Sequence, residues 1–139
     1  MTRLLLIVLA LFVLAGCGDD RLLHQDGSSE YILQGEQKTQ PGPAQWRAWF
    51  YVAECTNIYE PNPNQITWWK VARITEHPSG RSIAGLANFT RNHIYIQRDW
   101  WDDWRISGAE ILHLKLGVGV RDGDDIYRAC SPMRYKDGR

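Results

Sequence analysis

"GAEILHLKLG", residues 108–117, is the stretch of sequence from which the fold can be argued. Its apolar residues recur at helical spacing, and Gly117 is the residue type that most readily adopts the left-handed conformation ending a helix. Asp99 or Asp102 supplies a side chain suited to cap the start of this helix. The pattern therefore predicts a helix that runs from one of these aspartates to about Leu116.

Two side chains that can take part in chemistry lie on this predicted helix. Glu110 and His113 are three residues apart, so they face nearly the same way. In the zinc-peptidase motif HExxH, two histidines bind the metal and the glutamate takes a proton from the metal-bound water. Here Ala109 stands at the first ligand position, while His113 and Glu110 match the second ligand and the general base. The same two residues are equally an ordinary hydrogen-bonding pair on a helix surface.

The segments around this motif follow a particular order. A tryptophan-rich helix ends near Cys55, a strand covers His93–Gln97, and the motif helix is followed by Asp-Gly-Asp-Asp at 122–125 and then by Cys130. From about Trp46 to Cys130 this order resembles that of small secreted bacterial zincin-type metallopeptidases. The resemblance implies an α+β, zincin-like fold with an N-terminal helix, an edge strand beside the motif helix, and a C-terminal tail closed by a disulfide.

The resemblance also implies a zinc site, but its ligand set is incomplete. Ala109 cannot bind a metal, and the loop that would supply the third ligand offers only Asp124 and Asp125 beside the retained His113. Catalytic zinc normally takes three protein ligands and leaves the fourth place to water. We therefore expect no resident cofactor, with zinc as the one candidate metal, and a degenerate site in which Glu110 has lost its catalytic role.

Three functions remain open on this sequence. The first is a non-catalytic zincin-like domain that binds a peptide or an envelope protein by strand addition. The second is an active zinc metallopeptidase with unusual ligands, although neither His77 nor His93 has a spacing that requires it to meet His113. The third is a structural envelope protein whose partner surface is the Trp-rich segment 100–104.

The N-terminus has the pattern of a bacterial lipoprotein signal. Residues 1–16 contain Arg3 and an unbroken apolar run over 4–14, followed by small residues before Cys17. Residues 14–17, Leu-Ala-Gly-Cys, resemble a lipobox, which implies acylation of Cys17 by palmitate-type chains and membrane anchoring. The alternatives are cleavage elsewhere or a short uncleaved anchor. We expect a cell-envelope location facing the periplasm or the exterior, and Gly18 slightly favours the outer membrane.

Charge and cysteine usage agree with export and argue against a nucleic-acid partner. Removal of the signal takes away Arg3 from 16 basic residues, which leaves 15 against 16 acidic ones and supplies no basic face. With Cys17 acylated, Cys55 and Cys130 remain, and a disulfide between them would stabilise the fold by about 4 kcal/mol. Two free thiols or a two-thiolate metal site are the competing interpretations.

The rest of the chain divides into a tether and one domain. Residues 17–43 are polar and predict a flexible tether, whereas 44–139 predict a single globular domain. In that domain we expect a helix over 44–55 and a two- to three-stranded sheet formed by 65–74, 82–89 and 93–97. We also expect two of the rings in the segment 100–104 to pack in the core beside Trp46 and Trp49.

Overall fold

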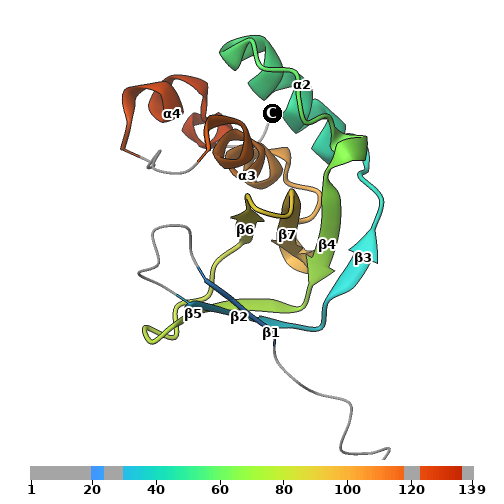
Figure 1. Ribbon diagram of the computed structural model, residues 1–139, viewed down its shortest axis with the longest axis vertical. Helices are drawn as coiled ribbons and strands as arrows, with labels where there is room; N and C mark the ends of the chain where they lie inside the picture. The colour runs from blue at the N-terminus through green and yellow to red at the C-terminus, as the bar shows by residue number, and fades with distance from the viewer. Residues whose placement is uncertain (1–19, 24–29, 118–122, 136–139) are drawn as a thin grey trace, which may run out of the picture.

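The computed structural model describes residues 20–23, 30–117 and 123–135, which form an α+β fold (Figure 1). Three 3-10 turns, η1 (Pro63–Gln65), η2 (Arg98–Trp100) and η3 (Pro132–Arg134), connect the longer elements. Those elements are, in chain order, β1 (Asp20–Leu23), β2 (Glu30–Gln34), β3 (Gln37–Thr39), α2 (Pro43–Thr56), β4 (Thr67–Val71), β5 (Arg73–His77), β6 (Gly85–Asn88), β7 (His93–Gln97), α3 (Trp104–Leu116) and α4 (Asp125–Cys130).

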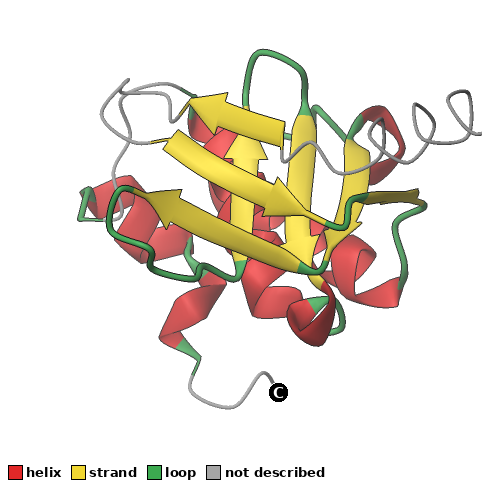
Figure 2. Cartoon of the chain, turned by 90° about the horizontal axis from the view of Figure 1, so that it is seen from below, coloured by secondary structure: helices red, strands yellow, loops and turns green. Residues whose placement is uncertain are grey.

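The strands form two sheets rather than the single small sheet expected from the sequence. One sheet has the order β1-β2-β5 with antiparallel neighbours, and the other has the order β3-β4-β7-β6, in which β4 and β7 are parallel. Figure 2 shows the three-stranded sheet crossing the four-stranded one, with the helices on the far side. The strand expected at 65–74 is consequently split between β4 and β5.

A shared bend explains how the chain passes from one sheet to the other. The amide of Ala72 donates to the carbonyl of Gln34 at 2.8 Å, so the breaks between β4 and β5 and between β2 and β3 lie together. Gly35 adopts a φ of +65°, and a Cβ at this position would lie 2.9 Å from the Cβ of Ala72. Only glycine therefore suits both the backbone conformation and the close approach of the two chain segments.

The prediction of a tether over 17–43 is wrong for residues 20–23, 30–34 and 37–39, which form three strands. β2 pairs with β5 along its whole length, and Tyr31 and Leu33 are buried in a second hydrophobic cluster with Ile74. β3 pairs with β4 in the other sheet. The polar composition of this segment concealed the two buried residues of β2, whose remaining positions are half-buried or exposed.

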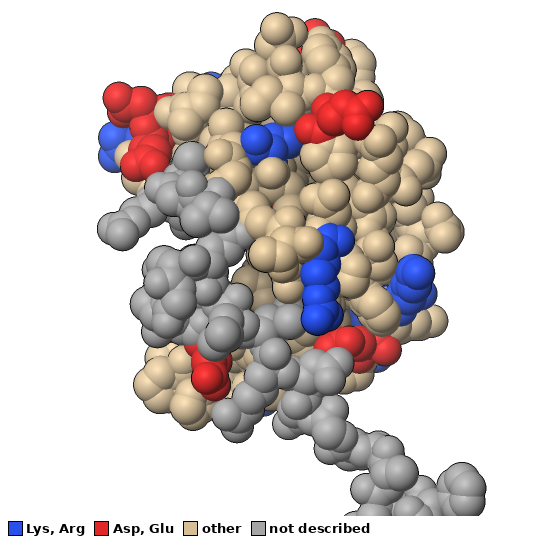
Figure 3. Space-filling model, in the orientation of Figure 1, with Lys and Arg blue, Asp and Glu red and all other residues tan. Residues whose placement is uncertain are grey.

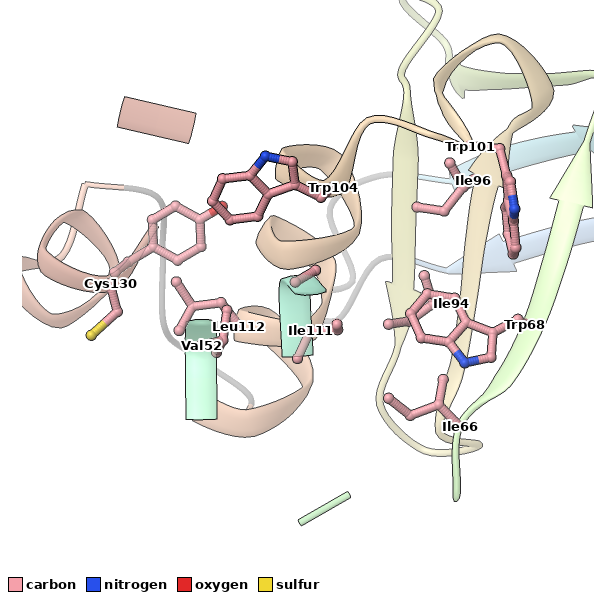
Figure 4. Packing of buried hydrophobic residues seen from close by; sticks show 12 residues of the cluster. Val52, Ile66, Trp68, Ile94, Ile96, Trp101, Trp104, Ile111, Leu112 and Cys130 are labelled. Carbon is pink, nitrogen blue, oxygen red and sulfur yellow. The ribbon is translucent and has the colours of Figure 1, made fainter. Parts of the chain in front are cut away.

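The main core lies between the four-stranded sheet and the helices α2 and α3. Figure 4 shows Ile94, Ile96 and Trp68 of the sheet facing Ile111 and Leu112 of α3. The sequence placed both helices correctly, although the residue that caps α3 is Asp103, whose carboxylate accepts from the amide of Arg105, and not Asp99 or Asp102. The buried residues of this cluster are Ala48, Val52, Ile66, Trp68, Ile94, Ile96, Trp101, Trp104, Ile111, Leu112, Tyr127 and Cys130.

The predicted disulfide is present and joins the ends of two helices. Cys55 near the end of α2 is bonded to Cys130 at the end of α4, which holds the short last helix against the body of the domain. The Trp-rich segment also behaves largely as expected, because Trp101 and Trp104 are buried. Trp46 does not join them and remains 40% exposed. Within the described residues, no helix combines the length and the apolar character needed to cross a membrane.

Candidate functional site

The motif helix α3 is enclosed by other elements along its whole length. All of its side chains from Trp104 to Leu116 are buried or half-buried. η3 packs closely against Gly108, where a Cβ would lie 2.4 Å from the Cγ of Pro132, and Ala109 beside it is buried. Tight packing therefore explains the glycine that precedes the motif.

Glu110 extends over the edge of the four-stranded sheet. Its Cγ and Oε1 lie 2.9 and 3.0 Å from the position that a Cβ would take on Gly85, the first residue of β6. The glycine thus leaves room for the acidic side chain to cover the strand. Glu110 is half-buried, so its carboxylate is placed at the sheet edge and not on the outer surface of the helix.

His113 lies one turn further along α3 and packs against a different element. Its ring centre is 4.7 Å from that of Tyr127 in α4, with 32° between the ring planes. Asp124 and Asp125 begin α4 and are exposed, with the carbonyl of Asp124 accepting from the amide of Arg128 at 2.9 Å. The imidazole is therefore held by the same short helix whose start carries the two predicted acidic ligands.

The described residues around α3 do not bring together the ligand set of a catalytic zinc ion. Among residues 20–23, 30–117 and 123–135, no group of three or more His, Cys, Asp or Glu side chains is placed to hold a metal. Catalytic zinc needs three such donors around one point. Asp122, the remaining acid of that loop, lies outside the described residues.

His93 and His77, whose spacing in the sequence does not require them to meet His113, lie on other surfaces of the fold. His93 is on the face of β7 opposite to Ile94 and Ile96, which contact the helices, and its Nδ1 lies 3.3 Å from the hydroxyl oxygen of Tyr95. His77 ends β5 in the other sheet, with its Nδ1 4.0 Å from a carboxylate oxygen of Glu30. Neither histidine is brought to His113, in agreement with the spacing argument.

The strand beside the motif helix differs from the one that the resemblance implied. β7 (His93–Gln97) lies inside the sheet between β4 and β6, so it is not an edge strand. In the described part of the chain, β6 pairs with β7 alone and forms that edge of the sheet. Glu110 therefore overlies the true edge strand, which the sequence marked only weakly because Gly85 interrupts its pattern.

A cluster of aromatic rings on the face of the four-stranded sheet that is turned away from the helices was not predicted, and its member Tyr95 is buried there against residues of the other sheet. Trp69 stacks on Tyr95 with ring centres 6.0 Å apart and 13° between the planes, and His93 lies 6.0 Å from Trp69. Burial lowers the pKa of His93, and the positive charges of Arg91 and Lys38 lower it further. The alternation of His-Ile-Tyr-Ile-Gln already placed His93 and Tyr95 on one face, whereas the parallel pairing that adds Trp69 requires the structure.

Charged side chains on the face shown in Figure 3 are interspersed, and basic groups do not form a continuous run there. This distribution agrees with the balanced charge of the sequence.

Comparison of the chain with protein-family models, with curated proteins and with solved structures found no match.

Proposed function

We propose that the chain is a membrane-anchored lipoprotein of the cell envelope, with a degenerate zincin-like domain that binds an extended peptide or protein segment without hydrolysing it. The observation that carries this proposal is the edge strand β6 lying beneath Glu110. An added strand would continue the sheet order β3-β4-β7-β6 by backbone hydrogen bonds.

The backbone of β6 is oriented for such pairing. The amide of Gln97 donates to the carbonyl of Ala84, so alternate residues of the β6 segment direct their polar groups toward β7. By this alternation, Gly85 and Ala87 direct theirs away from β7, toward the open edge. Glu110 lies over the same end of the strand.

The side chains around the motif helix argue against hydrolysis, because too few metal ligands are brought together there among the described residues. Glu110 and His113 pack against β6 and α4 respectively, and the described residues assemble no third ligand near them. A carboxylate without a metal-bound water has no activated nucleophile to deprotonate. Binding without cleavage therefore uses the residues present, whereas a peptidase would need donors that the described part of the chain does not bring together.

The proposed anchor places the domain close to its membrane. β1 begins at Asp20, three residues after the proposed acylation site Cys17. Three residues span at most about 10 Å when fully extended. We therefore infer that the β1 end of the domain lies near the lipid headgroups, in place of the long flexible connection that the sequence suggested.

The binding proposal is tested by amide hydrogen exchange on the full chain in mild detergent. The probe is a short alternating Val-Thr peptide with terminal lysines, and the control peptide carries N-methyl groups on alternate amides. We expect the first peptide, and not the second, to protect the amides of Gly85 and Ala87. Unchanged exchange at both positions with either peptide would contradict strand addition.

The same sample decides between binding and hydrolysis. Mass spectrometry should recover the peptide intact, and metal analysis should find no stoichiometric zinc. Cleavage that disappears in His113→Ala, together with zinc lost in that variant, would instead establish the metallopeptidase. Glu110→Gln is tested beside His113→Ala in the cleavage assay. It keeps the shape of the Glu110 side chain while removing its charge.

A further inference from the structure

A second surface, distinct from β6, is formed by the outer side of α2 and the loop after it. Four aromatic residues gather there, Trp46, Trp49, Phe50 and Tyr59, which we call the aromatic patch. Trp46, Phe50 and Tyr59 are 40%, 60% and 47% exposed, and Trp49 is half-buried between Trp46 and Tyr59. Neighbouring exposed aromatic side chains of this kind mark interaction sites more often than scattered single ones do.

The aromatic patch is held in place by the loop. The Trp46 and Trp49 ring centres are 5.8 Å apart at 78°, and those of Trp49 and Tyr59 are 6.3 Å apart at 69°. The indole N–H of Trp49 donates to the carbonyl of Pro61 at 3.1 Å, and the Tyr59 hydroxyl donates to Glu54 at 3.0 Å. Because the rings are already ordered, a ligand would lose little binding free energy to fixing them.

The exposed acidic groups at the margin of the patch are Glu54 and Glu60, and the half-buried Lys115 partly offsets their charge. Residues 43–65 contain the acids Glu54 and Glu60 and the single base Arg47. The Arg47 guanidinium lies 4.4 Å from the ring centre of Trp104, which is a buried residue outside the patch. Both glutamates are exposed, so the patch combines aromatic rings with carboxylates at its margin. In Figure 3 the surface over α2 is mostly uncharged, with a few charged groups set into it.

The chain itself already places a cation beside this patch. The ammonium of Lys115 lies 5.8 Å from the ring centre of Trp49 and donates to the carbonyl of Pro61 at 3.2 Å. Attraction between a cation and an aromatic face is strongest for tryptophan. The remaining rings, Trp46 and Phe50, are exposed and have no such partner among the described residues.

We propose that the aromatic patch, with Glu54 and Glu60, binds an arginine- or lysine-bearing segment of a partner protein. Arginine side chains stack on aromatic faces and pair with carboxylates, so both features of the patch contribute. An anionic lipid surface is disfavoured because the two glutamates would be repelled by it. The position of the patch also argues against a lipid surface, because α2 lies at the opposite end of the molecule from β1, the strand nearest the proposed anchor (Figure 1).

The test is a titration of the full chain, held in neutral-lipid nanodiscs, with a short peptide of alternating arginine and glycine. Binding is followed by isothermal calorimetry, and a glutamate-glycine peptide is the charge-reversed control. We expect the dissociation constant to rise roughly two- to fivefold for Trp46→Ala and similarly for Glu54→Gln. The matched control is Trp100→Ala, which removes a tryptophan that is 45% exposed outside the patch.

Three outcomes would overturn the proposal. Equal loss of affinity in Trp100→Ala would show that binding is not confined to the patch. Equal binding of the glutamate-glycine peptide would show that charge does not select the ligand. Protection of Trp46 from an aqueous fluorescence quencher in anionic-lipid nanodiscs, but not in neutral ones, would identify lipid as the occupant. None of these outcomes bears on strand addition at β6, which is tested at different residues.

Discussion

Gly85 of β6 lies directly beneath Glu110 of α3, with room for the glutamate only because the strand residue has no side chain. Gly85→Ala would bring a Cβ to within 2.9 Å of the Glu110 Cγ and 3.1 Å of the Ile96 Cδ1. We expect this overpacking to lower the free energy of unfolding by about 1–3 kcal/mol, measured by urea denaturation.

A double-mutant cycle separates the contact with Glu110 from general damage to the strand. Gly85→Ala should cost less in the Glu110→Ala background, because the atoms that it meets first have been removed. The matched control is Gly123→Ala, where an added Cβ meets nothing within 4 Å. Identical costs of Gly85→Ala in both backgrounds would mean that the two residues are not in contact.

A buried glutamine joins the starts of α2 and α3. Gln45 is fully buried, and its amide nitrogen donates to the carbonyl of Trp101 at 2.8 Å and to the hydroxyl of Ser107 at 3.1 Å. Its amide oxygen accepts from the backbone of Gly42 at 2.9 Å. Gln45→Leu removes all three bonds and leaves buried polar groups without these partners. The expected loss is about 2–4 kcal/mol in the free energy of unfolding, since each such group costs roughly 1–3 kcal/mol.

The control for this variant is Gln37→Leu on the exposed strand β3. A substitution of the same chemistry at a solvated position should change stability by no more than about 0.5 kcal/mol. If the two variants were equally stable, the hydrogen bonds of Gln45 would not be important to the junction of the helices.

Elements defined by local sequence were predictable to within a residue or two. The alternation in His93–Gln97 gave the bounds of β7, and Pro43 with the following aromatic spacing gave α2. The start of α3 was less certain because three aspartates lie close together at 99, 102 and 103, and only the geometry shows that Asp103 caps the helix.

Features that depend on contacts between distant segments were not predictable. The bend at Ala72 requires Gly35 from another part of the chain, so one apolar run became two strands in two sheets. The candidate site shows the same limit. The spacing of Glu110 and His113 was visible, but nothing in that spacing indicates that one side chain packs on β6 and the other on α4.

Lys115 should make stability depend on pH in an alkaline window. Burial lowers the pKa of Lys115 to about 8, although the nearby charge of Glu60 raises it in part. An unfolded lysine titrates near 10.4, so between about pH 8 and 10.4 the unfolded state binds more protons. The free energy of unfolding should therefore rise with pH across this window through Lys115, and the contribution should disappear as pH falls through 8.

The variant Lys115→Met isolates this effect from other groups that titrate at the same pH. Denaturation curves at several pH values should show a smaller upward slope for the variant than for the natural chain. Lys70→Met is the matched control, because Lys70 also lies beside a tryptophan, with its ammonium 4.7 Å from the ring centre of Trp101. Equal slopes for Lys115→Met and the natural chain would show that Lys115 keeps its charge when the protein is folded.

The proposed zincin ancestry is tested at Ala109, which is 7% exposed and lies four residues before His113. Ala109→His inserts a large side chain into a packed site, so without metal we expect a loss of about 1–3 kcal/mol in the free energy of unfolding. Two histidines four residues apart on a helix can bind zinc together, and binding to the folded state alone raises its stability. Zinc should therefore recover part of the loss in Ala109→His. Ala109→Leu, similar in bulk but without a donor, should lose comparable stability and not respond to zinc. An Ala109→His variant that is equally indifferent to zinc, or one whose response survives His113→Ala, would remove the support for this ancestry while leaving strand addition at β6 open.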